Sequence, residues 1–208
     1  MRKLVPYKSP RYAVSALDNG GRFYNLYTKP DDGEITRAEL AKVAGVYTNR
    51  QRMFLHLEMA IAELSDSDKS QVYGCLSKDL AAAKRKYAPA KMTPAEAADS
   101  GKPSRTAIVE GIPSYVKSAK DFSGFIPIMV GKVMVMIPII DRYDVYEVRE
   151  KKTSQKCLVA HARRKDKLPA IRTRFGGVLK KLNGKKGEPQ KHKVFLDTIY
   201  YSPVEKNV

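Results

Sequence analysis

Near the N-terminus, two short runs of residues alternate between apolar and polar positions around a glycine-containing turn. The runs cover residues 12–17 and 22–27, and the sequence Asp-Asn-Gly-Gly separates them at 18–21. Asn and Gly tolerate the positive φ that a tight turn needs, so the pattern favours a β-hairpin. A helix over either run is the alternative interpretation.

The period then becomes helical over three segments. Thr36 and Glu39 form a capping-box pattern, and Gly45 suits the left-handed position that ends a helix. Thr48 and Gln51 form a second such pattern, before apolar positions at helical spacing up to residue 64. A third helix is predicted after the polar residues 65–68, with one apolar stripe formed by Val72, Leu76, Leu80, Ala83 and Tyr87.

The second half of the chain has the alternation of β-strands. Residues 89–104 contain three prolines and no apolar period, which is typical of a linker with at most one short turn at 93–98. Gly131-Lys132 would turn a tight hairpin within the longest apolar run. Alternating β-branched and aromatic residues predict strands over 106–116, 125–130, 133–140, 143–148, 157–162 and 194–201.

These elements predict an α+β fold. We expect a β-hairpin and a three-helix cluster in residues 1–88, a linker in 89–104 and a β-rich basic region in 105–208. The β-rich region would form an antiparallel sheet or a partly open small barrel. One continuous domain remains the alternative, because a linker in sequence need not be one in space.

Composition indicates the cellular compartment in which the protein is expected. The longest apolar run, residues 125–140, is interrupted by Gly131-Lys132 and two prolines and is shorter than the roughly 20 residues of a spanning helix. Residues 1–7 lack the apolar core of a signal peptide, and Cys75 and Cys157 make no disulfide framework. We therefore expect a cytoplasmic protein without a membrane contact.

Charge indicates a class of partner. The 208 residues carry 39 Lys and Arg against 22 Asp and Glu, a net charge of +17. Residues 151–208 hold 16 basic and 4 acidic side chains, so the last quarter of the chain carries +12. A segment with charge of one sign and of this length indicates an anionic partner.

The basic C-terminal tract predicts contacts with nucleic-acid phosphates. Gly176-Gly177 would let backbone amides approach an anion, and aromatic residues such as Tyr143, Tyr146, Tyr200 and Tyr201 would stack on bases unless they pack in the core. The predicted binding residues of the tract are Arg163, Arg164, Lys165, Lys167, Arg172, Arg174, Phe175, Lys180, Lys181, Lys185 and Lys186.

A second contact surface is predicted in the helical part. Residues 36–64 follow a helix–turn–helix pattern, with Ala41 four residues before Gly45. Asn49, Arg50 and Arg52 would then begin the second helix, where base edges are contacted. Gln51 stands where that motif usually has an apolar residue, and helical hairpins without a DNA function are the alternative.

Two metal-dependent interpretations are weaker. Residues 32–39 match the second half of an EF-hand loop, with Asp32 and Glu39 as the only carboxylates at ligand positions, and a turn before a capped helix explains them equally well. A cluster of acids beside Lys152 is typical of the end of a metal-dependent nuclease site, but acids between strand positions are ordinarily solvated; these acids are Asp141, Asp144, Glu147 and Glu150.

The sequence therefore favours a non-catalytic nucleic-acid-binding protein without a cofactor or a metal. The alternative is a structural or interaction protein whose basic surface docks onto an acidic protein partner, and a nuclease is the third reading. The choice between DNA and RNA and the oligomeric state stay open.

Overall fold

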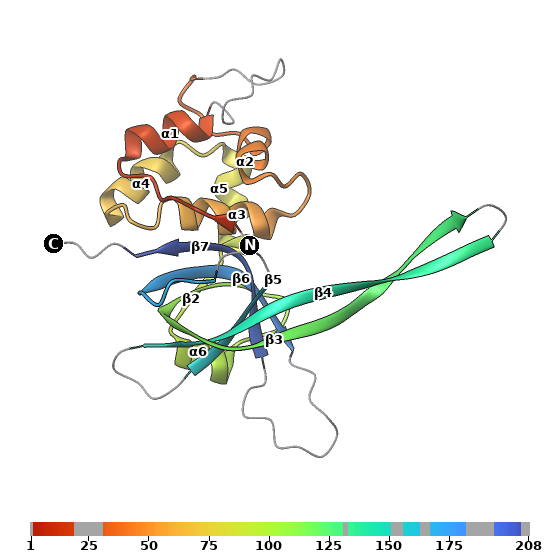
Figure 1. Cartoon of the computed structure of the whole chain (residues 1–208). Coiled ribbons are helices and arrows are strands. Elements are labelled where there is room, and N and C mark those ends of the chain that lie inside the picture. Colours follow the sequence, from red (N-terminus) through yellow and green to blue (C-terminus); the bar gives the residue numbers. More distant parts are fainter. Residues whose placement is uncertain are drawn as a thin grey trace.

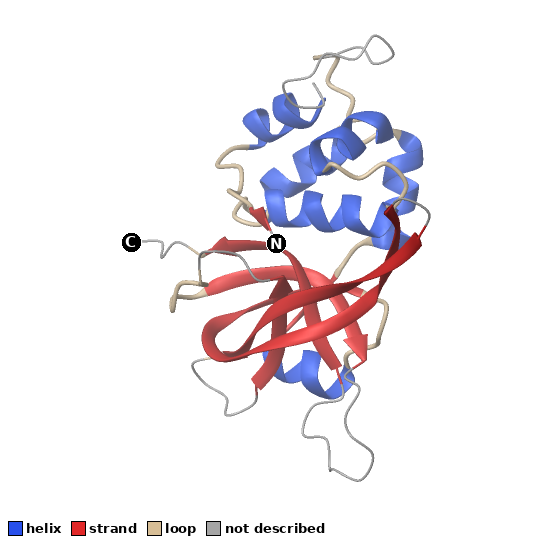
Figure 2. Cartoon of the chain, turned by 45° about the vertical axis from the view of Figure 1, so that its right-hand side comes forward, coloured by secondary structure: helices blue, strands red, loops and turns tan. Residues whose placement is uncertain are grey.

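The computed structural model describes residues 2–18, 31–130, 133–150, 156–162, 167–181 and 194–204, and for residues 117, 119–130, 133–142, 161 and 162 it describes only the backbone. Helices and sheet are both present, which confirms the α+β fold (Figures 1 and 2). The elements are β1 (Arg2–Lys3), α1 (Pro10–Asp18), α2 (Arg37–Ala44), α3 (Arg50–Ala60), α4 (Asp66–Gly74), α5 (Lys78–Tyr87), β2 (Ala90–Met92), α6 (Pro94–Ser100), β3 (Thr106–Val130), β4 (Val133–Arg149), β5 (Lys156–Ala162), β6 (Thr173–Lys181) and β7 (Val194–Pro203).

The sheet closes into a ring. β3 pairs with β4, β4 with β5, β5 with β7, β7 with β6, and β6 with β3. β1 and β2 add to β7 and β3, so the sheet is ring-like without being a regular barrel. The pairs β1–β7, β2–β3 and β5–β7 are parallel, which corrects the expected antiparallel sheet to a mixed one.

The start of α2 follows its sequence signals closely. The side chain of Thr36 accepts a hydrogen bond from the backbone N–H of Glu39, and the Glu39 carboxylate accepts one from the backbone N–H of Thr36. Gly45 ends the helix with φ 66°, in the left-handed region that favours glycine. At the next helix the N-cap is one residue later than predicted, because Asn49 and not Thr48 accepts the hydrogen bond from Arg52.

Two predicted elements in the helical part differ from the structure. Residues 10–18 form α1, so the first strand of the expected hairpin is wrong and its helical alternative holds, while the second run, 22–27, lies outside the described residues. The predicted third helix is two helices, α4 and α5. Leu76, between them, forms a bridge with Ile35, and this backbone pairing interrupts the helical hydrogen bonds.

The proline-rich residues 89–104 are not an irregular linker. β2 pairs in parallel with β3, and α6 begins with a capping box between Thr93 and Glu96 that has Pro94 at its first position. Ala97 of α6 is buried with the core that the ring encloses. α6 lies at the end of the ring opposite to helices α1–α5 (Figure 1).

Helix α3 joins the helical part to the sheet. Leu55 and Met59 of α3 share an apolar cluster with Leu4, Ile108 and Tyr200, and each is buried. This close approach depends on Gly176 of β6, where an added Cβ would lie 3.0 Å from the Met59 Cγ and 3.1 Å from the Leu55 Cδ1. Most of the remaining apolar core divides into one cluster among the helices and another inside the ring.

Strands β3 and β4 continue past the ring as a long two-stranded ribbon (Figures 1 and 2). Their pairing runs out to Val130 and Val133, which leaves two residues for the connection and confirms the predicted tight hairpin at 131–132. The two connecting residues themselves lie outside the described part of the chain.

Candidate nucleic-acid interface

The first turn of α3 presents charged side chains at the surface of the helical part. Arg50 and Arg52 are exposed, whereas every residue from Met53 to Ala60 is buried. A recognition helix that lay along a groove of DNA would need an exposed face beyond its first turn. The burial of α3 therefore argues against that use of the predicted helix–turn–helix, and leaves Asn49, Arg50 and Arg52 as exposed residues at the N-terminus of a helix, where an anion is favoured.

Further cations lie beside this first turn. Burial raises the pKa of Tyr200, and the charges of Arg52 and Arg2 lower it. The Arg2 guanidinium also lies beside the end of α2, where its Nη1 would be 3.7 Å from a Cβ added at Gly45. On the other side, the Arg50 guanidinium lies 5.8 Å and the Lys86 ammonium 5.5 Å from the centre of the Tyr87 ring. We refer to Arg2, Arg50, Arg52, Lys86 and Tyr87 as the α3 surface.

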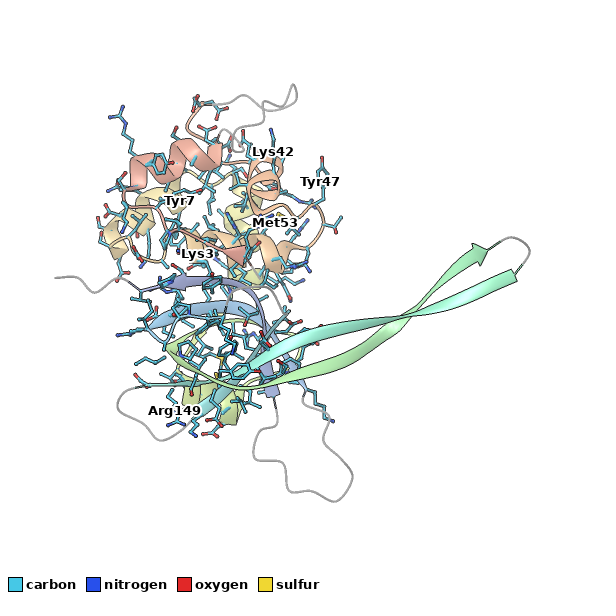
Figure 3. The ribbon with its side chains drawn as sticks, in the orientation of Figure 1. Lys3, Tyr7, Lys42, Tyr47, Met53 and Arg149 are labelled. Carbon is cyan, nitrogen blue, oxygen red and sulfur yellow. The ribbon has the colours of Figure 1, made fainter. Side chains whose placement is uncertain are left out.

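The cations of the α3 surface have no acidic partner among the described residues. Within that part of the chain no carboxylate lies at ion-pair distance from Arg2, Arg50, Arg52 or Lys86. The exposed Tyr47 lies just before the first turn of α3, on the outside of the helical part (Figure 3). Unpaired cations beside aromatic rings suit phosphates and bases.

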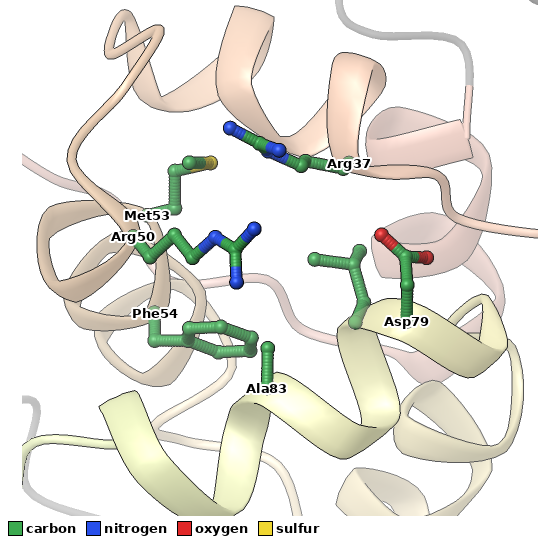
Figure 4. A pocket seen from close by; sticks show the side chains of 7 residues that line it. Arg37, Arg50, Met53, Phe54, Asp79 and Ala83 are labelled. Carbon is green, nitrogen blue, oxygen red and sulfur yellow. The ribbon is translucent and has the colours of Figure 1, made fainter.

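The hollows at this surface are unsuited to a small-molecule substrate. Arg37, Arg50 and Asp79 line a cavity of about 40 Å³ between α2, α3 and α5 (Figure 4). That volume is far below the roughly 300 Å³ at which ligand pockets begin. The second hollow is larger, about 490 Å³, but it is wide open to solvent, and it is lined by Thr48, Asn49, Arg50, Gln51 and Tyr87. An extended polymer contacts an open surface of this kind more readily than a metabolite does.

In the C-terminal tract, several predicted binding residues are already engaged. The Glu110 carboxylate accepts hydrogen bonds from Arg172 at 3.1 Å and from Arg174 at 2.5 Å, and the Arg174 side chain is only 10% exposed. The Lys180 ammonium lies 2.6 Å from the Asp197 carboxylate. These three cations of β6 and its preceding residues therefore have partners on neighbouring strands.

The aromatic and glycine residues of the tract serve the core. Phe175 is fully buried in the cluster inside the ring, which corrects its prediction as a stacking residue. Gly177 lies against the backbone carbonyl of Asp197, and Gly176 lies under α3, so both glycines permit close packing instead of anion contact. The alternation of Thr173, Phe175 and Leu179 was a strand signal that the basic residues between them obscured.

Two predicted stacking tyrosines are also core residues. The Tyr146 hydroxyl accepts a hydrogen bond from the backbone N–H of Leu168 at 3.2 Å. The Tyr200 hydroxyl donates one to the Ala44 carbonyl at 3.2 Å. Both rings are buried, whereas Tyr143 and Tyr201 are half-buried. The structure exposes Tyr12, Tyr47 and Tyr115 instead, none of which the sequence singled out.

The rest of the predicted tract divides into exposed residues and residues outside the description. Lys181 is exposed, and the Lys167 ammonium lies 4.5 Å from the centre of the Tyr115 ring. The predicted residues that fall outside the described residues are Arg163, Arg164, Lys165, Lys185 and Lys186.

Two acids of the nuclease interpretation, Asp144 and Glu147, do not converge. Asp144 is buried and accepts a hydrogen bond from the Ser118 hydroxyl at 2.7 Å. Glu147 lies on the opposite face of β4, because successive strand residues alternate between faces. Its carboxylate binds the Lys156 ammonium at 2.7 Å, and this hydrogen bond is the main cause of its lowered pKa. Two carboxylates on opposite faces of a strand cannot hold one metal ion.

The half EF-hand serves as a helix cap. Glu39 accepts hydrogen bonds from the backbone N–H and the hydroxyl of Thr36, at 2.8 Å and 2.7 Å. Burial raises the pKa of Glu39, these hydrogen bonds oppose the rise, and the charges of Asp18 and Asp32 add to it. In the described ranges, no three His, Cys, Asp or Glu side chains are grouped to hold a metal ion.

Comparison with known proteins adds no further information on this surface. No protein-family model matches the chain, and no curated protein matches it. Within the residues described, no helix is both long and apolar enough to cross a membrane.

Proposed function

We propose that this protein binds nucleic acid without catalysis, through phosphate contacts made by exposed cations. The observation that carries the proposal is the α3 surface, where arginines without a carboxylate partner in the described part of the chain lie at the N-terminus of a helix. The free N–H groups and the dipole of a helix N-terminus favour an anion, and the guanidinium groups add charge and hydrogen bonds. The net charge of +17 extends this attraction beyond one site.

The proposal assigns different roles to the two basic regions. The α3 surface supplies phosphate contacts together with Tyr47 and Tyr87 as stacking groups. In the C-terminal tract, exposed cations such as Lys181 add contacts, while Arg172, Arg174 and Lys180 stabilise the sheet through Glu110 and Asp197. Since phosphate contacts carry no sequence information, we expect binding with little sequence preference.

The test is the salt dependence of binding for matched variants. Fluorescence anisotropy of labelled single- and double-stranded DNA and RNA would compare the wild-type chain with the double variant Arg50→Ala/Arg52→Ala. We expect weaker binding of every sequence and a salt slope smaller by about two, because each phosphate contact contributes about 0.9. Arg11→Ala is the control for the loss of one charge away from α3, since Arg11 is exposed on α1, and it should leave the slope nearly unchanged.

Two results would contradict the proposal. One is a double variant that binds as tightly and with the same slope as Arg11→Ala. The other is a wild-type chain that binds none of the four nucleic acids at moderate salt, which would favour the acidic protein partner. Equal melting temperatures of all three chains would show that the comparison is between folded proteins.

A further inference from the structure

The outer part of the β3–β4 ribbon, residues 120–142, pairs only with itself among the described strands, and we call it the arm. β6 pairs with β3 only over Thr106–Gly111, and β5 reaches β4 only as far as Tyr143. The arm extends away from both the ring and the helices (Figures 1 and 2). An isolated two-stranded ribbon is marginally stable in water, so an arm of this length indicates a partner.

Prolines protect the edges of the arm from strand addition. Val130 and Val133 flank a two-residue connection and so form a hydrogen-bonded pair, after which hydrogen-bonded and non-hydrogen-bonded pairs alternate. Pro127 and Pro138 both fall in non-hydrogen-bonded pairs, where a backbone N–H would face the open edge. Each edge of the arm thus lacks one backbone N–H donor, while the hydrogen bonds between β3 and β4 are all kept. A partner is expected on the faces of the arm, not on its edges.

The register places different residues on the two faces. Cross-strand partners share a face, and successive residues alternate between faces. Face A carries Phe122, Phe125, Pro127, Met129, Met134, Met136, Pro138 and Ile140. Face B carries Ile126, Ile128, Val130, Val133, Val135, Ile137 and Ile139, with Gly124 opposite the last of these. Both faces are therefore apolar along the outer half of the arm, which a ribbon in water would not retain without a function.

The charges at the base of the arm differ in sign between the faces. Lys120 pairs with Arg142 on face A, and Asp121 pairs with Asp141 on face B. Like charges directly opposite each other destabilise a ribbon. With the bases of two arms side by side, contact between two copies of face A would bring four cations together, and contact between two copies of face B would bring four carboxylates together. Face A on face B instead sets the basic pair of one copy against the acidic pair of the next.

We propose that the arm is a self-assembly element, in which face A of one copy of this chain stacks on face B of the next. Such a contact is heterologous, so it leaves one unused face at each end and continues into a ring or a filament. The branched residues of face B are stiff, and the Met residues of face A adapt to them. Lys132 is the only charged residue between Phe122 and Ile140, so nucleic acid does not fit the arm.

Matched variants on the two faces test the direction of stacking. Met136→Glu alters face A, and its neighbour Val135→Glu alters face B. Sedimentation of the full chain, freed of nucleic acid, would compare wild type, each variant and their equimolar mixture. We expect oligomers larger than a dimer for wild type, monomers for each variant alone, and dimers for the mixture. The mixture retains one intact face A and one intact face B, which make a single contact.

Charge reversal at the base of the arm supplies a second, independent test. The variant Lys120→Asp/Arg142→Asp makes both faces acidic at the base, and Asp121→Lys/Asp141→Lys makes both basic. Each variant alone should lose the large oligomers, and the mixture of the two should regain them. In the mixture, every contact can join an arm with acidic residues at its base to an arm with basic residues there. Unchanged melting temperatures would confirm that the ring and the helices are intact, since the arm lies outside both.

Three results would overturn the proposal. A monomeric wild-type chain at the highest concentration reached would mean that the arm fits a different partner. Oligomers that persist in both glutamate variants would place the contact elsewhere. Loss of oligomers in only one of the two glutamate variants would indicate a two-fold contact between identical faces.

Discussion

The two basic regions of this protein differ in how their cations are compensated. On β6, the neighbouring strands β3 and β7 supply acidic partners. Arg174 forms an ion pair with Glu110 of β3, and Lys180 forms one with Asp197 of β7. At the first turn of α3, the neighbours are helix ends, and no described carboxylate pairs with Arg50 or Arg52. Among the described residues, a cation of β6 is therefore more often held by a neighbouring carboxylate than a cation of the first turn of α3 is.

The largest expected effect concerns the compensated region. Glu110→Gln would leave the Arg174 guanidinium buried without its carboxylate, and removal of one partner of a buried pair costs about 3 kcal/mol or more. We expect the free energy of unfolding in urea to fall by that amount, with nucleic-acid affinity unchanged or increased. Glu34→Gln, at an exposed carboxylate, is the control. Equal stability of the two variants would show that the Glu110 pair is not structural.

A buried histidine, His56 of α3, lies between the helical part and the sheet, where its ring contacts the Tyr200 ring of β7. Burial, with a smaller contribution from the charge of Arg2, lowers the pKa of His56 from 6.5 to about 4. Below pH 6.5 the unfolded chain binds a proton at His56 that the folded chain takes up only near pH 4. The free energy of unfolding should thus fall as pH falls through this window, by on the order of 3 kcal/mol in total.

The variant His56→Leu isolates this contribution from the other titrating groups. Its free energy of unfolding should change less between pH 7 and pH 4 than that of wild type. Urea unfolding at several pH values measures the difference. Parallel pH profiles for the two chains would mean that His56 titrates alike in the folded and unfolded states.

The smallest effect distinguishes two neighbouring lysines of β6. Lys180 lies on Asp197, whereas Lys181 is exposed. Lys181→Ala should reduce the salt slope of binding by about one, and Lys180→Ala should leave it nearly unchanged. Anisotropy with one oligonucleotide is sufficient for this pair. A larger loss of slope for Lys180→Ala would reverse the assignment of paired and available cations.

Signals that act over a few residues predicted the structure best, in the helices and in the sheet. The capping box at Thr36 and the left-handed Gly45 need only hydrogen bonds within a few residues, and both are as predicted. The hairpin at 131–132 was equally local. β6 was missed because its alternation is interrupted by Gly176-Gly177, whose purpose is visible only once Leu55 of α3 and the Asp197 backbone lie against them.

The candidate site shows the same limit. The sequence located the positive charge and included Arg50 and Arg52, but it weighted the C-terminal tract more heavily. Cross-strand pairing with Glu110, more than 60 residues away, is invisible to a count of charges along the chain. The approach of Arg2 and Tyr87 to α3 likewise depends on the tertiary fold. The capping box at Thr93 was a local signal in a segment that its prolines marked as a linker.

The central claim is that nucleic acid is the partner of this positive charge. The most direct measurement is the affinity of the wild-type chain for oligonucleotides of increasing length, each at several salt concentrations. We predict that affinity rises with length and that its logarithm falls linearly with the logarithm of salt, with a slope of several contacts. Binding that is absent at moderate salt for every length, or that does not change with length, would contradict the account.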